Sequence, residues 1–162
     1  MEVIGSTEYV EIAGIDKVPA KIDTGADSSA VWASNIEMKK DGTLVFSLFD
    51  KDSPFYTGER IETTDYRAKS VRSSLGDNQI RYRVKLPLKI GDKEFETTFT
   101  LADRARNEFP ILIGRRTLEG NYIVDVTKTE VARQGATHSK RLNQELKENP
   151  YEFHQKYMEK GE

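Results

Sequence analysis

The segment from residue 22 to residue 29 holds the residues that could most directly do chemistry. It reads apolar, then Asp23, Thr24 and Gly25, then small residues. Glycine lets two backbone segments approach closely, and the threonine hydroxyl can lock a loop, so the aspartate is held at a fixed point above a strand end. A carboxylate fixed in this way can accept or donate a proton. On these three residues alone, a plain turn after a strand is the better interpretation.

A second segment, at residues 111–115, adds weight to a functional interpretation of the Asp23 segment. A compact apolar run over residues 111–113 ends in Gly114, and Arg115 opens the segment that follows. This pattern predicts a buried strand that feeds one short helical turn.

The elements that would position these residues read as an all-β domain. From Tyr9 to about Val131, short alternating or β-branched apolar runs are separated by Gly, Pro, Asp and Asn. Asp41-Gly42 and Gly91-Asp92 each predict a hairpin turn. The expected strands cover residues 9–12, 18–22, 30–33, 36–38, 44–49, 84–90, 95–101, 111–113 and 122–126, with a turn at 14–17 and a loop or irregular edge at 50–62.

The composition changes after Gln134 to Ser, Lys, Asn, Gln and Glu. Apolar residues recur there at helical spacing, behind a cap at Thr137 or Ser139, and Pro150 is expected to stop that helix. The chain is therefore predicted to divide into a β domain over residues 1–133 and a helical C-terminal appendage over residues 134–162.

Length and composition narrow the function classes. The chain has 162 residues, which suits one domain and is too short for two ordinary ones. Its 25 Lys and Arg against 27 Asp and Glu give a net charge of -2, which predicts no nucleic-acid or membrane partner. Cysteine is absent, which excludes disulfides and favours a cytoplasmic location. No stretch approaches the roughly 18 apolar residues of a membrane span, and no signal-peptide pattern is visible.

The two elements in this order resemble the retropepsin family of aspartic proteases. Its hallmarks are an apolar-Asp-Thr-Gly-Ala loop and, later, an apolar-apolar-Gly strand that leads into a short helix beginning with arginine. More closely, the chain resembles the bacterial branch formerly labelled ATP-dependent zinc proteases, which is associated with ATP-grasp ligases. Residues 21–30, 71–74 and 112–126 carry this likeness.

The resemblance implies a retropepsin-like closed β barrel that pairs with a second copy of itself. Each chain would supply one Asp23, because only one Asp-Thr-Gly is present. Two carboxyls about 3 Å apart share one proton, so one acts as base on a water while the other donates to the scissile carbonyl. Thr24 would hydrogen-bond to its twin across the dimer, and Gly25 would permit close approach. The implied activity is that of an aspartic endopeptidase that needs no cofactor.

The same resemblance assigns supporting roles around the loop. Ala26 and Gly114 match the small residues of the family pattern, and Asp27 and Arg115 match a carboxylate and guanidinium that brace the loop against the helix. A bidentate pair would suit the geometry of arginine. The alternative is that both side chains are separately solvated.

Retropepsins cover the cleft with a mobile hairpin called the flap, and the candidate here is residues 69–82. Its expected tip and substrate contacts are Arg72, Ser73, Ser74, Leu75 and Gly76. Only one glycine is present there, unlike the retroviral pattern, so an ordinary hairpin loop is the alternative.

Metal and nucleotide chemistry find no support. The two histidines, His138 and His154, both lie in the C-terminal segment without ligand spacing, so no metal site is predicted. No phosphate-binding loop is present, so any ATP dependence would belong to a partner. A different class of function stays open, namely a non-catalytic peptide-binding or interaction module on the same fold. The intact Asp23, Thr24 and Gly25 favour the peptidase.

The expected substrate is a peptide, and a glutamate-rich one follows from the ligase association. Cations are frequent on the candidate flap, where they could line a groove for acidic peptides or form its solvated face. They are Arg67, Lys69, Arg72, Arg81, Arg83 and Lys85. Five aromatic residues are expected in core or interface packing, namely Trp32, Phe46, Phe49, Phe95 and Phe99.

Overall fold

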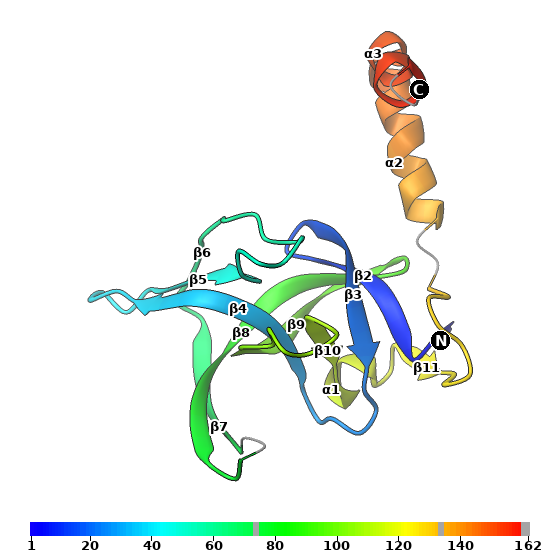
Figure 1. Cartoon of the computed structure of the whole chain (residues 1–162). Helices are drawn as coiled ribbons and strands as arrows, with labels where there is room; N and C mark the ends of the chain where they lie inside the picture. Colours follow the sequence, from blue (N-terminus) through cyan, green and yellow to red (C-terminus); the bar gives the residue numbers. More distant parts are fainter. Residues whose placement is uncertain (73–74, 133–134, 160–162) are drawn as a thin grey trace.

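The computed structural model describes residues 1–72, 75–132 and 135–159. The described chain is mostly β-structure, with one short helix inside the β domain and helices at the C-terminal end (Figure 1). The strands are β1 (Glu2–Ile4), β2 (Thr7–Ile12), β3 (Ile15–Ile22), β4 (Ser29–Met38), β5 (Leu44–Leu48), β6 (Ile61–Thr63), β7 (Tyr66–Arg72), β8 (Asn78–Ile90), β9 (Lys93–Ala102), β10 (Ile111–Ile113) and β11 (Tyr122–Val124). The helices are α1 (Arg115–Leu118), α2 (Gly135–Glu148), α3 (Pro150–His154) and the π-helical turn η1 (Gln155–Glu159).

Six strands close into a barrel. The hydrogen-bonded order runs β10-β3-β2-β8-β9-β4, and β4 then pairs back onto β10. The pairs β3–β10 and β4–β9 are parallel, while the other neighbours in the ring are antiparallel. The closed all-β barrel with one short helix after the apolar-Gly strand is therefore confirmed.

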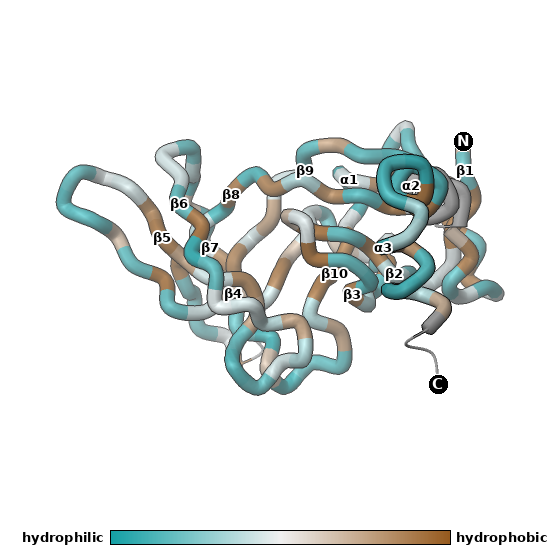
Figure 2. Tube along the Cα trace, turned by 90° about the horizontal axis from the view of Figure 1, so that it is seen from above, coloured by the Kyte–Doolittle hydropathy of each residue, from teal (hydrophilic) through white to brown (hydrophobic). Residues whose placement is uncertain are grey.

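Alternation of side chains along the strands builds the core. In β3, Val18, Ala20 and Ile22 are buried at every second position, as a half-buried strand requires. Figure 2 shows hydrophobic and hydrophilic positions interspersed along the barrel strands. Among the five aromatic residues predicted to pack inside, Phe46, Phe49 and Phe99 are fully buried, and Trp32 and Phe95 pack against the core from its edge.

Three predicted hairpins form, one with a corrected turn. Met38 pairs with Leu44 across the Asp41-Gly42 turn, and β8 returns to β9 at Gly91-Asp92. The turn between β2 and β3, however, is Ala13-Gly14 rather than residues 14–17, because Ile12 pairs with Ile15. Both turn residues have positive φ, 47° and 83°, the conformation whose twist matches the flanking strands.

Two further segments match their predictions in outline. Residues 50–60 lack regular strands, and β6 adds a short edge to β5. The last predicted strand, 122–126, is shorter than expected. β11 ends at Val124 because Asp125 turns the chain by accepting hydrogen bonds from the backbone and hydroxyl of Thr127, at 3.0 and 2.6 Å. β11 pairs in parallel with β1 outside the barrel.

The C-terminal segment is helical, and two details differ from the prediction. α2 begins at Gly135, so Thr137 and Ser139 lie inside the helix rather than at its cap. Pro150 does follow the end of α2, but it also starts α3, where proline is tolerated because first-turn N–H groups have no helical partner. α2 leads away from the barrel (Figure 1). Glu145 ties it to η1 by accepting from Lys156 at 2.9 Å and from the Tyr157 hydroxyl at 2.8 Å.

A buried carboxylate fastens both ends of the β domain to the barrel. Glu8 is only 2% exposed. Its Oε2 accepts from the backbone N–H groups of Gly5 at 2.7 Å and Val131 at 3.1 Å, and its Oε1 accepts from Ala132 at 2.9 Å. Backbone donors that are far apart in the chain thus stabilise one buried charge, and Glu8 holds the segment after β11 against β2.

Glu8→Gln is expected to destabilise the domain by about 2 kcal/mol, because the amide NH₂ group would face a backbone N–H that needs an acceptor. Thermal unfolding and amide hydrogen exchange at Val131 and Ala132 would measure the change. Glu119→Gln, at an exposed position, is the matched control. Equal melting temperatures for the two variants would contradict this role of Glu8.

Candidate active site

The aspartate of the Asp-Thr-Gly segment lies at one end of the barrel, directly after β3. Its backbone N–H donates to the carbonyl of Ile113 at 2.8 Å. Because β3 and β10 run parallel with Ile22 opposite Ile113, both strands end at the same level. Asp23 is half-buried, and the loop that it begins lies beside α1 (Figure 1).

The loop's own backbone orients the Asp23 carboxylate. The N–H of Gly25 donates to Oδ1 at 3.0 Å, and the N–H of Ala26 donates to the Asp23 carbonyl at 3.2 Å. A Cβ at residue 25 would lie 3.2 Å from that Oδ1, which is closer than most side chains allow. Glycine therefore lets the backbone approach its own carboxylate, and the carboxylate is held in one orientation.

The short helix α1 braces the loop from behind. The backbone N–H of Arg115 donates to the backbone carbonyl of Ala26 at 2.8 Å. Nη1 of the Arg115 side chain donates to the carbonyls of Thr24 at 3.3 Å and Gly25 at 3.4 Å. One guanidinium thus holds two successive carbonyls of the loop. These contacts join two segments that lie some ninety residues apart in the sequence.

Asp27 and Arg115 form an ion pair, but through one contact rather than the predicted bidentate pair. Instead, Asp27 divides its carboxylate between two arginines. Oδ1 lies 3.6 Å from Nη2 of Arg115, and Oδ2 lies 3.2 Å from Nη2 of Arg116. Arg115 already donates to the loop carbonyls, so only one side of its guanidinium is left for the carboxylate. All three side chains are about half-exposed, so these ion pairs orient the loop more than they stabilise the fold.

Gly114 lets the loop and α1 pack backbone against backbone. A Cβ at this position would lie 2.5 Å from the carbonyl carbon and oxygen of Ser28. The Gly114 N–H donates to the hydroxyl of Ser29 at 3.0 Å, and this hydroxyl also bonds to that of Thr117 at 2.7 Å. Ser29 and Thr117 are buried, and sequence reasoning missed both. Ser28 and Ser29, which stand directly before an apolar strand, were the sequence signal that could have identified the buried hydroxyl of Ser29.

The predicted flap is a hairpin of β7 and β8, with Arg72 opposite Asn78. Leu75 at its tip is 88% exposed, and Gly76 has φ of 88°. Ser73 and Ser74 lie outside the described residues. Figure 1 shows the hairpin on the same side of the barrel as the loop after β3. Nζ of Lys69 donates to the Ser28 hydroxyl at 3.2 Å, so hairpin and loop are in contact.

The strand register sorts the flap cations onto two faces. Opposite residues of an antiparallel pair project from the same face, and faces alternate along each strand. Arg72 is therefore on one face, and the other five predicted cations share the second. They are Arg67 opposite Arg83, Lys69 opposite Arg81, and Lys85 two residues further along β8. The contact from Lys69 to Ser28 turns this basic face toward the loop.

Another arginine near the site escaped the sequence analysis. Arg104 follows β9, and its Nε donates to the carbonyl of Phe109 at 3.0 Å. Burial lowers the pKa of Arg104, the charge of Arg81 lowers it further, and the charge of Asp23 raises it. Arg104 thus lies within electrostatic range of both Arg81 and Asp23.

Neither a metal cluster nor a spanning helix is found in the described parts of the chain. No group of three or more His, Cys, Asp or Glu side chains there is arranged to hold a metal ion. No helix among those residues is both long and apolar enough to cross a membrane.

The comparison with protein families decides the assignment. The model of a family described as "RimB-like: Retropepsin-like aspartic endopeptidase RimB" matches residues 3–135. The chain belongs to this family. The retropepsin-like resemblance read from the Asp23 loop and the Gly114 strand is thereby confirmed. The match takes in both elements and stops at the first residue of α2.

Several curated relatives carry the name "Probable alpha-L-glutamate ligase". The one from Desulfotalea psychrophila is 27% identical over 129 residues, which are 76% of this chain and 28% of the relative. The one from Shewanella pealeana is 26% identical over 132 residues, 78% of this chain and 29% of the relative. The chain therefore spans less than a third of the length of these proteins.

A solved structure shares the fold. A Legionella pneumophila protein described as of unknown function superposes with a TM-score of 0.59 and is 26% identical. The match covers 82% of this chain and 98% of that one. The fold of this chain is thus one that another bacterial protein adopts over almost its whole length.

Proposed function

We propose that this protein is an aspartic endopeptidase that works as a homodimer, with Asp23 of each copy in one active site. The observation that carries the proposal is the carboxylate at the barrel end, oriented by the Gly25 N–H at 3.0 Å in a loop braced by Arg115. Only one Asp-Thr-Gly is present in the chain, so a second copy has to supply the second carboxylate.

In the proposed dimer, two carboxyls about 3 Å apart share a single proton, because like charges at that distance do not both ionise. The ionised carboxylate takes a proton from a water held between them, and the water oxygen attacks the scissile carbonyl. The protonated carboxyl donates its proton to the carbonyl oxygen, which gives a tetrahedral gem-diol. Collapse of this intermediate, with proton transfer to the leaving nitrogen, breaks the peptide bond without a covalent enzyme intermediate.

The loop geometry suits this role. Thr24 is exposed at the tip of the loop, where its hydroxyl would meet the same residue of the partner. Gly25 has no side chain to hold two loops apart. Arg115 donates to the carbonyls of Thr24 and Gly25, which would hold the loop in place for contact with a second copy.

An apolar surface outside the barrel supports pairing of two copies. In the two-stranded sheet of β1 and β11, Val3 lies opposite Ile123. These side chains are 42% and 51% exposed, and Val126 just beyond is 72% exposed. Burying them against a second copy would remove apolar area from water, and the sheet has open edges to which strands can add.

We further propose a glutamate-rich peptide as substrate, in functional association with an ATP-grasp ligase and in the cytoplasm. The name of the longer relatives, which concerns ligation of L-glutamate, supports this choice of substrate and partner. The basic face of the β7–β8 hairpin, turned toward the loop by the contact from Lys69 to Ser28, supports it independently. A peptide that is bound without being cleaved would instead fit the alternative of a non-catalytic module.

Dilution tests the homodimer. Specific activity on a quenched glutamate-rich peptide is expected to fall as the enzyme is diluted, because dissociation separates the two halves of the site. Sedimentation velocity at the same concentrations should show monomer replacing dimer. Full specific activity in a sample that sediments only as monomer would overturn the shared active site.

A further inference from the structure

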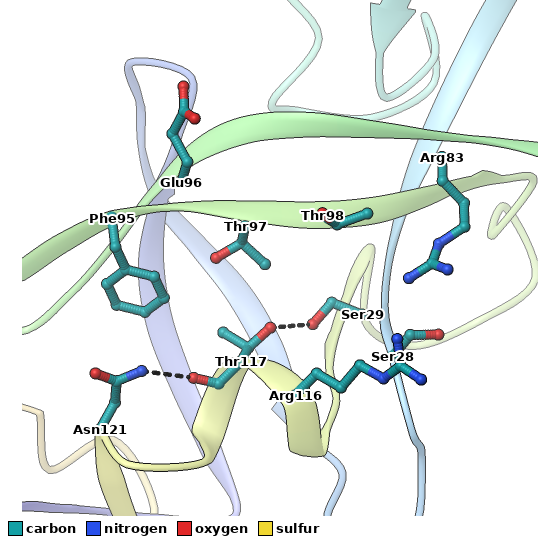
Figure 3. A pocket seen from close by; sticks show the side chains of 10 residues that line it. All are labelled: Ser28, Ser29, Arg83, Phe95, Glu96, Thr97, Thr98, Arg116, Thr117 and Asn121. Carbon is teal, nitrogen blue, oxygen red and sulfur yellow. Dashed lines mark hydrogen bonds between the residues drawn. The ribbon is translucent and has the colours of Figure 1, made fainter. Parts of the chain in front are cut away.

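A polar pocket lies beside the loop, outside the catalytic residues. It is open to solvent on one side, has a volume of about 300 Å³ and is lined by the start of β4, by β9, by Arg83 of β8 and by α1. Figure 3 shows Arg83 and Thr97 entering it from the strands, and Arg116 extending along its floor from α1 to Ser28. Ser28 follows Asp27 directly, so the pocket adjoins the loop that carries Asp23.

Two residues that line this pocket each carry a buried polar atom without a partner among the described residues. Nε of Arg83 and Oγ1 of Thr97 are both buried and make no hydrogen bond within the described residues. Thr97 is only 6% exposed, so its hydroxyl cannot turn to bulk solvent. Buried polar atoms are normally satisfied, so these two unpaired atoms mark the wall beside the pocket as a place where the protein alone leaves hydrogen-bonding capacity unused.

The arginine side chains that line the pocket favour a negatively charged ligand. Arg116 forms an ion pair with Asp27, with 3.2 Å between Nη2 and Oδ2. Arg83 takes part in no ion pair among the described residues. Glu96 also contributes to the rim, but its carboxylate points away from the cavity (Figure 3). One guanidinium without a counter-ion therefore dominates, and it matches a single negative charge better than a doubly charged group.

Arginine geometry narrows the ligand to a carboxylate. The planar guanidinium of Arg83 can donate two parallel hydrogen bonds to a carboxylate, while the hydroxyl of Ser28, which accepts from Lys69, can supply a further donor at the wall. We propose that this pocket is a specificity subsite that binds the side-chain carboxylate of an acidic substrate residue near the scissile bond. This inference rests on the proposed peptidase function and names the residues that would select its substrate.

Matched peptides test the subsite by kinetics. For the wild-type protein, a peptide with glutamate at the subsite position is expected to have a kcat/KM at least about tenfold above that of the glutamine peptide. Arg83→Gln should lower kcat/KM for the glutamate peptide by about 30-fold and leave that for the glutamine peptide within about twofold. Lys51→Gln, which removes an exposed charge from the loop after β5, is the control and should preserve the preference. Equal losses on both peptides would overturn the subsite.

A binding measurement separates this inference from the peptidase proposal. The Asp23→Asn protein should bind a fluorescent pentaglutamate peptide, and adding Arg83→Gln should weaken binding by at least about tenfold, whether or not the wild-type protein cleaves anything. A C-terminally amidated peptide should bind equally well, because the side chain is the ligand. Unchanged affinity in the Arg83→Gln variant would overturn the subsite, as would inorganic phosphate displacing the peptide at concentrations near the peptide's own Kd.

Discussion

Asp23→Asn is expected to reduce kcat for peptide hydrolysis by at least about a thousand-fold, with folding retained. Asparagine has nearly the same shape, and its Oδ1 can still accept from the Gly25 N–H that now holds the carboxylate at 3.0 Å. Its amide, however, neither takes a proton from water nor donates one to the substrate as a carboxyl does. In the proposed dimer the two copies share one site, so a dimer of the variant would lose both carboxylates at once.

The measurement is steady-state hydrolysis of a quenched peptide, with thermal unfolding as the test of folding. Asp52→Asn, an exposed aspartate outside the barrel, is the control and should keep full activity. Mixing Asp23→Asn protein with wild-type protein should also suppress wild-type activity as mixed dimers form. Unchanged turnover in the Asp23→Asn variant would remove the peptidase and leave the non-catalytic module.

Gly114→Ala is expected to lower the free energy of unfolding by about 3 kcal/mol or more and to abolish activity. The added Cβ would lie 2.5 Å from the backbone carbonyl of Ser28. A backbone carbonyl cannot swing aside like a side-chain tip, so loop and helix would have to separate. That separation would break the hydrogen bond from Gly114 to Ser29 and move Arg115 away from the carbonyls of Thr24 and Gly25.

Gly120→Ala is the matched control for this prediction. Gly120 has φ of 75°, but nothing lies within 4 Å of an added Cβ, so only the backbone conformation opposes the alanine. The expected cost is about 1 kcal/mol. Thermal unfolding and peptide hydrolysis should therefore rank the variants as wild type, Gly120→Ala and Gly114→Ala. A Gly114→Ala protein as stable and active as the Gly120→Ala protein would show that the loop and α1 do not depend on backbone contact.

Local sequence cues were enough for the parts of the fold that depend on neighbouring residues. The turn at Gly91-Asp92 and the loop that ends in Gly42 each need positive φ at their glycine, 64° and 90°, which is the conformation that glycine adopts without steric cost. The loop at Asp23 and the strand ending in Gly114 were likewise readable, because each is a short pattern with its own steric reason. The turn after β2 was misplaced because Ala13 has positive φ, a conformation that no local pattern predicts for an alanine.

Tertiary structure decided the interactions that join distant residues. The Ser29–Thr117 bond spans 88 positions and the contact of Glu8 with Ala132 spans 124. Nothing within a local window specifies such pairs, because they arise only when barrel closure brings the strands together. The same holds for the division of Asp27 between Arg115 and Arg116, and for the sorting of flap cations by strand register. The amino-acid sequence by itself identified which residues are candidates for chemistry, whereas the folded barrel decided which neighbours each of them has, because strand pairing sets the direction of each side chain.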